Sequence, residues 1–292
     1  MKFGKIVPTE NQEFLLPPTH PLTFKALAQY PVAKLNAYVG APQWNKNELQ
    51  GFYPKGTKDE LLYYAKHFNS IEFNATFFKT PSKEQVQIWA NKTPENFRFC
   101  PKITQSISHY SRLLNTDFKV LEFLDAIALF QNKLGCVFLQ LNDNFSPNEL
   151  VKLVDFINKF PKNFPLAVEI RSAQWQENTE AYQKYYNTLV QHQQCNLLVD
   201  TPGRQDLLHM QLSNHTAFVR FVATNTTQDY SRLDQWVDRI AEWNKAGLQN
   251  LYFFVHQEMQ PETPFLAAYF IEKLNKSLQL NLTSPQKPLT LF

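Results

Sequence analysis

The stretch SIEFNATF (residues 70–77) has the apolar content of a buried strand, but a glutamate stands near its centre. Glu72 and Asn74 are two positions apart, so in a strand their side chains lie on the same face. An unpaired carboxylate in an apolar environment costs several kcal/mol, so Glu72 needs cationic or hydrogen-bonding partners from other strands. The stretch therefore predicts a strand that is buried on both faces and contributes to a polar site.

Further runs of this kind occur along the chain, and stretches with helical spacing of apolar residues separate them. The other strand candidates are LNAYVGA (35–41), FRFCPKIT (97–104), CVFLQLN (136–142), LAVEIRS (166–172), NLLVDT (196–201), AFVRFVA (217–223) and LYFFVHQ (251–257). The clearest helix candidates are residues 58–68, 116–134, 146–160, 179–193, 231–246 and 263–278. Because the strand candidates are almost entirely apolar, they fit parallel strands that are covered on both faces.

Eight strand candidates alternating with helical stretches within about 250 residues predict an α/β protein, a single (β/α)8 barrel of the TIM type. We expect the barrel over residues 35–280, an N-terminal extension over 1–34 that packs on it, and a C-terminal tail over 281–292. A doubly wound open sheet is the alternative fold. It is disfavoured because no glycine-rich turn follows the first strand candidate and eight strands fit closure of a barrel.

Composition narrows the class of protein. The chain of 292 residues is 43% hydrophobic and 19% charged, which excludes a disordered protein. Its net charge of +3 is too small to demand a nucleic-acid partner. Cys100, Cys136 and Cys195 lie in or beside apolar segments and predict buried, reduced thiols. No secretory signal and no run approaching about 18 apolar residues occurs in the sequence, so we expect a cytoplasmic protein without membrane contact.

Polar side chains at the ends of the strand candidates locate the expected site. In a (β/α)8 barrel the active site lies at the carboxyl ends of the strands. We expect three acids and three cations to converge on one pocket there, namely Glu72, Glu169, Asp200, Lys102, Arg171 and Arg220. The alternative is an ion network that only stabilises the barrel. Since buried ion pairs are weak stabilisers, a ligand site is the better interpretation.

The residue types suggest roles. Glu72, Lys102 and Glu169 are the candidate catalytic residues, the carboxylates for acid–base chemistry and the amine as a base or Schiff-base nucleophile. Lys102 would also bind an anionic group of the substrate together with Arg171 and Arg220. The other candidate binding residues are Asn74, Gln140, Asp200 and His256, with the aromatic side chains of Trp44, Trp175 and Tyr230 to stack on a sugar or a base.

Several pieces of the sequence together resemble one known family. They are YVGAPQW (38–44), GFYPKG (51–56), YYAKHFNSIEFNATFFKTPS (63–82), WANKTPENFRFCPKIT (89–104), KLGCVFLQL (133–141), AVEIRSAQW (167–175), FVRF (218–221) and LDQWVDRIAEW (233–243). The set resembles the domain of unknown function 72 family, also called YecE-like. The resemblance implies a TIM-type barrel, similar in fold to endonuclease-IV-like and xylose-isomerase-like barrels, and it implies no established activity.

The family pattern also marks positions in this chain. It falls on Gly40, Trp44, Tyr53, Glu72, Asn74, Phe77, Lys102, His109, Gln140, Glu169, Arg171, Trp175, Asp200 and Arg220. The family usually has histidines where this chain has Ser172 and Val222, and Asn-Asn-Asp near VHQ (255–257).

The sequence thus predicts a protein that binds, and as an enzyme would act on, a small anionic substrate that is phosphorylated or carboxylated and sugar-like. Two alternatives stay open. One is a non-catalytic module that senses a small anion or a nucleic-acid end. The other is a metal-assisted hydrolase or isomerase of the endonuclease-IV or xylose-isomerase type, in which a divalent metal ion would bind the acids. No metal ligand and no cofactor is assigned, and the oligomeric state is not predicted.

Overall fold

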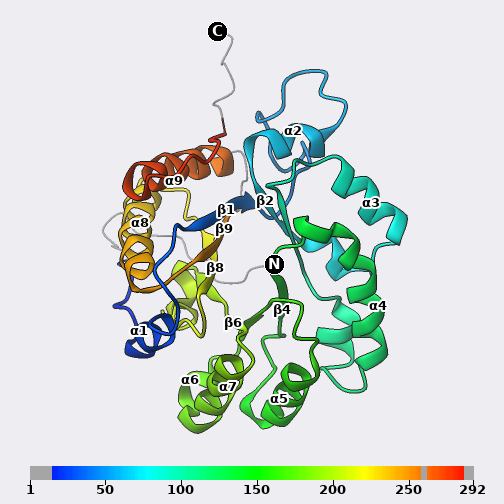
Figure 1. The fold of residues 1–292 in the computed structure, drawn as a ribbon, viewed down its shortest axis with the longest axis vertical. Coiled ribbons are helices and arrows are strands. Elements are labelled where there is room, and N and C mark those ends of the chain that lie inside the picture. Colours follow the sequence, from blue (N-terminus) through cyan, green and yellow to red (C-terminus); the bar gives the residue numbers. More distant parts are fainter. Residues whose placement is uncertain (1–14, 258–261, 286–292) are drawn as a thin grey trace.

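The computed structural model describes residues 15–257 and 262–285. Its strands lie at the centre of the molecule, and the helices lie around them (Figure 1). The strands are β1 (Asn36–Ala41), β2 (Ser70–Phe73), β3 (Arg98–Pro101), β4 (Val137–Gln140), β5 (Leu166–Glu169), β6 (Cys195–Asn196), β7 (Leu198–Asp200), β8 (Thr216–Val222) and β9 (Asn250–His256). The expected strand 196–201 is therefore interrupted at Leu197.

All strand pairs are parallel, and they form two sheets. One has the order β3-β2-β1-β9-β8-β7, and the other has the order β4-β5-β6. The prediction of an α/β fold with parallel strands is confirmed. Between β3 and β4 there are two isolated bridges, Phe99 with Leu134 and Lys102 with Phe138. Between β6 and β7, the amide of Leu197 donates to Val168 of β5 at 3.0 Å.

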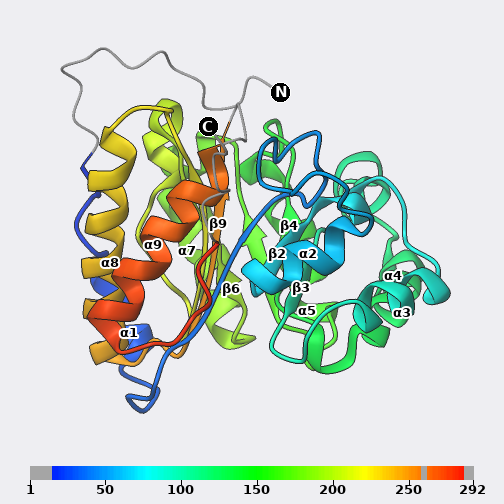
Figure 2. The same cartoon turned by 90° about the horizontal axis from the view of Figure 1, so that it is seen from above.

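The helices connect these strands. They are α1 (Pro21–Leu27), α2 (Glu60–His67), α3 (Lys83–Asn91), α4 (Asp117–Ile127), α5 (Leu150–Lys159), α6 (Gln174–Glu177), α7 (Thr179–Gln191), α8 (Gln228–Ala246) and α9 (Thr263–Leu278). Figure 2 shows α8 and α9 side by side at one end of the molecule, with α3 and α4 at the other end. The expected helix 116–134 continues past α4 as a 3-10 segment, η3 (Ala128–Lys133), which contains Gln131 at φ 52°. No helix in the described part of the chain is long and apolar enough to cross a bilayer.

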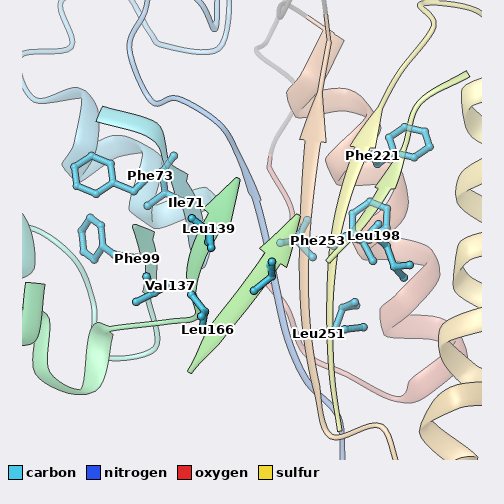
Figure 3. Close-up of a cluster of buried hydrophobic side chains, with 14 of the residues drawn as sticks. Ile71, Phe73, Phe99, Val137, Leu139, Leu166, Leu198, Phe221, Leu251 and Phe253 are labelled. Atoms are coloured by element: carbon cyan, nitrogen blue, oxygen red, sulfur yellow. The ribbon is translucent and has the colours of Figure 1, made fainter. Parts of the chain in front are cut away.

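Buried side chains of the strands fall into two clusters, because successive residues of a strand point to opposite faces. The first cluster includes the strand residues labelled in Figure 3, among them Ile71 and Phe253. The second cluster consists of Cys100, Cys136, Phe138, Ala167, Cys195, Leu197, Val199, Leu207, Phe218, Tyr252 and Phe254, with Tyr38 packed against it. The three cysteines are free and buried, as the sequence predicts.

The described part of the N-terminal segment packs on α8 and on the irregular segment before β8. Thr23 donates its hydroxyl to the carbonyl of Met210 at 2.8 Å, and Trp243 of α8 donates its indole N–H to Thr19 at 3.0 Å. Gly247 ends α8 with φ 120°, a conformation that favours glycine. A Cβ atom at Gly247 would lie 2.3 Å from the carbonyl oxygen of Leu27, so the close approach of α1 to this turn also requires glycine.

Candidate functional site

The alternation of side chains brings polar residues from six strand segments to the same face as the second cluster. Lys102, Gln140, Glu169, Arg220 and His256 each stand two positions after a member of that cluster, namely Cys100, Phe138, Ala167, Phe218 and Phe254. Glu72 lies between Ile71 and Phe73 of the first cluster and therefore points to the opposite face. All six side chains stand at or near the carboxyl end of their strand. Together with Asn74 and Arg171 they form what we call the charged network.

Arg220 is the centre of the charged network. Its guanidinium donates from Nε and Nη2 to the two carboxylate oxygens of Glu72, at 3.0 and 3.1 Å. Its Nη1 donates to Oε2 of Glu169 at 2.8 Å. Glu72 and Glu169 are buried, with 0% and 1% of their surface exposed. Such charge-assisted, bidentate contacts are the ones that make a buried carboxylate tolerable.

Glu169 has further partners from the segment that follows β5 and from β4. Arg171 donates from Nε to Oε1 of Glu169. Gln140 donates its amide to the carboxylate oxygens of Glu169 at 3.2 and 3.0 Å. The amide oxygen of Gln140 in turn accepts a hydrogen bond from Nζ of Lys102 at 2.7 Å. Gln140 therefore links the lysine to the carboxylate.

Glu72 has further partners on the other side of the network. Nε2 of His256 lies 2.7 Å from Oε2 of Glu72, and Asn74 donates its amide to Oε1 of Glu72 at 2.9 Å. The side chain of His256 is 15% exposed. His256 and Asn74 are the partly exposed members of the charged network, so the network reaches solvent on their side.

These contacts determine the charge state of both acids. Burial opposes ionisation of Glu72, but Arg220 and His256 outweigh it and hold the pKa of Glu72 well below its ordinary value. Burial also opposes ionisation of Glu169, yet Arg171 and Arg220 lower the pKa of Glu169 to about 2. Both groups are therefore carboxylates at neutral pH. They suit the orientation of cations better than the donation of protons.

Lys102 is held differently from the two arginines. Burial, and then the positive charge of Arg220, lower the pKa of Lys102 to about 7, against the opposing effect of Glu169 and Glu72. Its Nζ lies 4.2 Å from the centre of the Phe77 ring. The 3-10 turn η1 (Asn74–Phe77), which follows β2, places this ring. Lys102 can therefore exist as an ammonium or as a free amine near neutral pH.

Asp200 does not belong to the charged network, so the expectation that it converges with the other acids is wrong. Its carboxylate forms an ion pair with Arg232 of α8 and accepts the indole N–H of Trp236 at 2.8 Å. The reason is register, because Val199 belongs to the second cluster and the next residue must face the helices. Asp200 fastens α8 to β7.

Two of the three candidate aromatic residues also lie elsewhere. The indole of Trp175 is fully buried, donates to the carbonyl of Phe145 at 2.7 Å and packs on Tyr185, which makes it a core residue. Tyr230, on α8, packs edge-on against Tyr269 of α9. Neither of them contacts the charged network.

Trp44 lies beside the charged network, in a separate pocket. Its ring stacks on Phe73 at 5.2 Å. A pocket of about 450 Å³ lies there, lined by Pro42, Gln43, Trp44, Asn45, Ile71, Phe73, Asn74, Ala75 and Phe78. Asn74 forms part of this wall and also bonds to Glu72, so it stands between the pocket and the network. The pocket offers apolar and aromatic surface next to the charged groups.

The strand pattern missed two residues near Lys102. Phe77 is the ring that Lys102 faces, and His109 lies in η2 (Ser106–Tyr110), a π-helical turn after β3, with its ring 5.0 Å from Phe77. Burial and the charge of Lys102 lower the pKa of His109. Phe77 falls within the expected strand 70–77, but β2 ends at Phe73 and residues 74–77 form the turn η1, so strand alternation does not place its ring. His109 lies in a turn after β3, where periodicity gives no signal. The family resemblance is the signal that marks them.

The donor set suits a metal ion poorly. Among residues 15–257 and 262–285, no three or more His, Cys, Asp and Glu side chains group closely enough to hold one. The carboxylate oxygens of Glu72 and Glu169 accept hydrogen bonds from guanidinium, imidazole and amide groups. A metal ion would have to displace these donors before it could bind.

Taken together, the fold and the network define a parallel α/β protein with a buried, charged site at the carboxyl ends of its strands. The family model described as "Protein of unknown function DUF72" matches residues 38–289, and the chain belongs to this family.

Known proteins resemble the chain over different shares of its length. The UPF0759 protein YecE of Escherichia coli K12 is 28% identical over 263 residues, which is 82% of this chain and 93% of the relative. The UPF0759 protein YunF of Bacillus subtilis is 28% identical over 148 residues, 47% of this chain and 51% of the relative. A crystal structure of a DUF72 family protein from Enterococcus faecalis V583 superimposes with a TM-score of 0.64 and 18% identity, covering 86% of this chain and 100% of the other. That likeness supports the fold.

Proposed function

We propose that the strands form one closed (β/α)8 barrel over residues 35–280, to which the segments 1–34 and 281–292 are appended, and that its charged network binds a small anionic, sugar-like molecule. We further propose that the protein acts in the cytoplasm, which the three free, buried thiols support.

Closure of the barrel is supported at both edges where the two sheets meet. The isolated bridges Phe99–Leu134 and Lys102–Phe138 join β3 to β4. The segment of β6 and β7 pairs with β5 through its first half and with β8 through its second half, so it belongs to both sheets. The second cluster then forms the interior of the barrel, because it draws side chains from β3 to β9 and packs against Tyr38 of β1.

Anion binding is supported by the composition of the charged network, and this observation carries the proposal. Two carboxylates face two guanidiniums, one ammonium and one imidazole. The carboxylates are fully hydrogen-bonded, whereas Lys102 donates to the neutral amide of Gln140. Asp143, whose side chain is 61% exposed, lies 3.9 Å from Nη1 of Arg171 at the edge of the network. When Lys102 is protonated, the buried groups of the network themselves carry excess positive charge, for which a phosphate or carboxylate is a suitable counter-ion.

The roles of individual residues follow from these contacts. Lys102 and Arg171 would bind the anionic group, and Arg220 would fix the positions of Glu72 and Glu169. Glu72 orients His256, which lies at the solvent side of the site. The pocket beside Trp44 and Phe73 would accept the apolar face of a sugar or of another ring.

Titration calorimetry tests this proposal with inorganic phosphate, glyoxylate and glyceraldehyde 3-phosphate. We expect saturable binding that weakens at least about tenfold in Lys102→Met and Arg171→Gln, since each removes a charge-assisted contact. Lys46→Met is the control, because Lys46 lies on the surface with 66% of its side chain exposed. Binding of equal strength in all variants would place the anion elsewhere.

The alternatives make different predictions in the same experiment. A module that only senses an anion would bind it and give no turnover. A metal-assisted hydrolase would require a divalent ion for binding, so a chelator would abolish the heat of binding. We favour metal-free chemistry because guanidinium and imidazole groups already occupy the carboxylate oxygens.

A further inference from the structure

Lys102 is surrounded as a nucleophilic amine needs to be. It is buried, with 7% of its surface exposed. Within the described residues no carboxylate oxygen lies within the 4.0 Å that defines an ion pair with its Nζ. Its hydrogen-bond partner is the neutral amide oxygen of Gln140 at 2.7 Å, and the Phe77 ring lies 4.2 Å away. A lysine becomes nucleophilic when burial and neighbouring cations favour its neutral form.

Lys133 shows the contrasting arrangement in the same protein. The side chain of Lys133 is also largely buried, at 13% exposed. Its Nζ, however, donates to the carbonyl oxygens of Ala90 and Thr93 at 2.8 and 2.7 Å and lies 3.4 Å from a carboxylate oxygen of Glu95. Two carbonyl acceptors and a carboxylate therefore surround its Nζ. The difference between the two lysines is therefore in their partners, and burial is common to both.

We propose that Lys102 is a covalent nucleophile that forms an imine with the carbonyl carbon of a small anionic aldehyde or keto acid. The inference rests on the proposed function, because the anion must first bind beside the lysine. It names the substrate class of that same site: a carbonyl compound that also carries a phosphate or a carboxylate. Arg171 pairs with Glu169 and lies 3.9 Å from the exposed carboxylate of Asp143, and we assign it to hold that anionic group.

The covalent step balances without an added oxidant or reductant. The lone pair of the neutral Nζ attacks the carbonyl carbon, a C–N bond forms, and the C=O electron pair moves to oxygen. Nitrogen loses one proton and the oxygen takes up one, which gives a neutral carbinolamine. The hydroxyl then takes up a second proton and leaves as water when the C–O bond breaks, while the nitrogen lone pair forms the C=N bond of a protonated imine. The network reaches solvent beside His256 and Asn74, so water there would deliver and accept these protons.

The imine explains why a site would keep a lysine among arginines. Once protonated, it withdraws electrons from the neighbouring carbon, so a C–H or C–C bond there can break and leave its electron pair in an enamine. Hydrolysis of the imine then returns the free lysine and the carbonyl product. The class of reaction is proton abstraction or aldol-type cleavage next to a carbonyl.

Reductive trapping tests the proposal. The full-length protein is incubated with glyoxylate or glyceraldehyde 3-phosphate, then reduced with borohydride, and the labelled peptides are mapped by mass spectrometry. We expect one stable adduct on Lys102 that saturates with the same concentration dependence as the heat of binding. Labelling of Lys133 should be at least tenfold lower. Excess inorganic phosphate should protect Lys102 from labelling.

Variants complete the test. Lys102→Arg keeps the charge but has no nucleophilic amine, so it should lose the adduct and keep measurable phosphate binding. Lys133→Arg should label as the wild-type protein does. Because mapping of the wild-type protein already locates the adduct, the result stands even if Lys102→Arg does not fold.

Two outcomes would overturn the proposal, and they differ. Saturable binding of both aldehydes without an adduct on Lys102, or with labelling spread evenly over surface lysines, would disprove the imine and leave the proposed anion site intact. Absence of any saturable binding of phosphate or of either aldehyde would overturn the anion site and the imine together.

Discussion

Arg220 on β8 forms a bidentate pair with Glu72 on β2, with hydrogen bonds of 3.0 and 3.1 Å between residues 148 positions apart in the sequence. The same guanidinium also bonds to Glu169, so one cation satisfies two buried carboxylates. Removal of one charge from this group leaves its partner buried and unpaired, which lowers the free energy of unfolding.

Replacement of Arg220 by Met should therefore destabilise the protein more than any other change in the network. It leaves two buried carboxylates without their principal cation, and a buried pair that loses one partner costs about 3–5 kcal/mol. Equilibrium unfolding in urea measures the loss. Arg220→Lys should recover only part of it, because an ammonium cannot form the bidentate contact. A loss below about 1 kcal/mol would mean that the network adds little to stability.

Glu169→Gln should keep the fold and weaken ligand binding. Arg220 would still have Glu72, so the loss of stability should be smaller than in Arg220→Met. Arg171 would lose its carboxylate partner at Glu169 and with it the orientation that anion binding needs. Circular dichroism and titration calorimetry of the same sample separate the two effects. Unfolding of the variant with no change in ligand affinity would favour a purely structural network.

Acid should destabilise the protein through the two network carboxylates. Arg171 and Arg220 outweigh burial and lower the pKa of Glu169 from 4.5 to about 2, and the pKa of Glu72 is also lowered. The unfolded state then binds more protons than the folded state in this interval, so stability is full above 4.5 and falls as the pH drops toward about 2. Urea unfolding at a series of pH values should show a shallower decline in Glu169→Gln. Identical slopes would contradict the assignment.

Lys102 should affect the dependence of stability on pH at neutral to alkaline pH. Its pKa of about 7 in the folded protein, against 10.5 for a free lysine, means that the unfolded state binds more protons between these values. The contribution of Lys102 to stability therefore rises with pH from about 7 upward. The charged groups around it that set this value are Arg220, Glu169, Glu72 and Arg171. We expect the unfolding free energy of the wild type, minus that of Lys102→Met, to rise from neutral to mildly alkaline pH. A difference that stays constant over this range would refute the lowered pKa of Lys102.

The turn after α8 offers a prediction that is independent of the site. Gly247→Ala introduces a Cβ that would lie 2.3 Å from the carbonyl oxygen of Leu27, at φ 120°. Gly51→Ala is the matched control, since Gly51 also has positive φ, 78°, but no atom lies within 4 Å of an added Cβ. The control should cost about 1–2 kcal/mol for its backbone conformation, and Gly247→Ala should cost clearly more. Thermal unfolding compares the stability of the two variants. Equal losses of stability would show that α1 moves away from the added Cβ without a large loss of free energy.

The parallel α/β fold could be predicted because strand and helix candidates alternate with distinct periods. The buried polar residues of the site could also be predicted, because apolar strands tolerate such groups only where the groups contact one another. These residues are Glu72, Lys102, Gln140, Glu169 and Arg220. The prediction for Asp200 is wrong because it depends only on the position of Asp200 at the end of a strand and ignores the face to which its side chain points. The alternation of Leu197, Val199 and Asp200 already shows that Asp200 faces away from the other acids.

The positions of several aromatic side chains could not be predicted from the strand patterns. Trp175 and Tyr230 follow strands in sequence, but their side chains pack into the helical layer, and this depends on tertiary contacts. The place of Phe77 beside Lys102 depends on the 3-10 turn that begins where β2 ends. Loop geometry of this kind has no period in the sequence.

The three cysteines of the second cluster give the protein a built-in reporter of its own opening. Burial raises the pKa of Cys195 to about 12, and it also raises that of Cys100 and Cys136. Only a thiolate reacts readily with electrophiles, and Cys100, Cys136 and Cys195 are 0%, 1% and 2% exposed in the folded state. The rate at which these cysteines react with a thiol reagent therefore reports how often the second cluster becomes exposed, and no label has to be introduced.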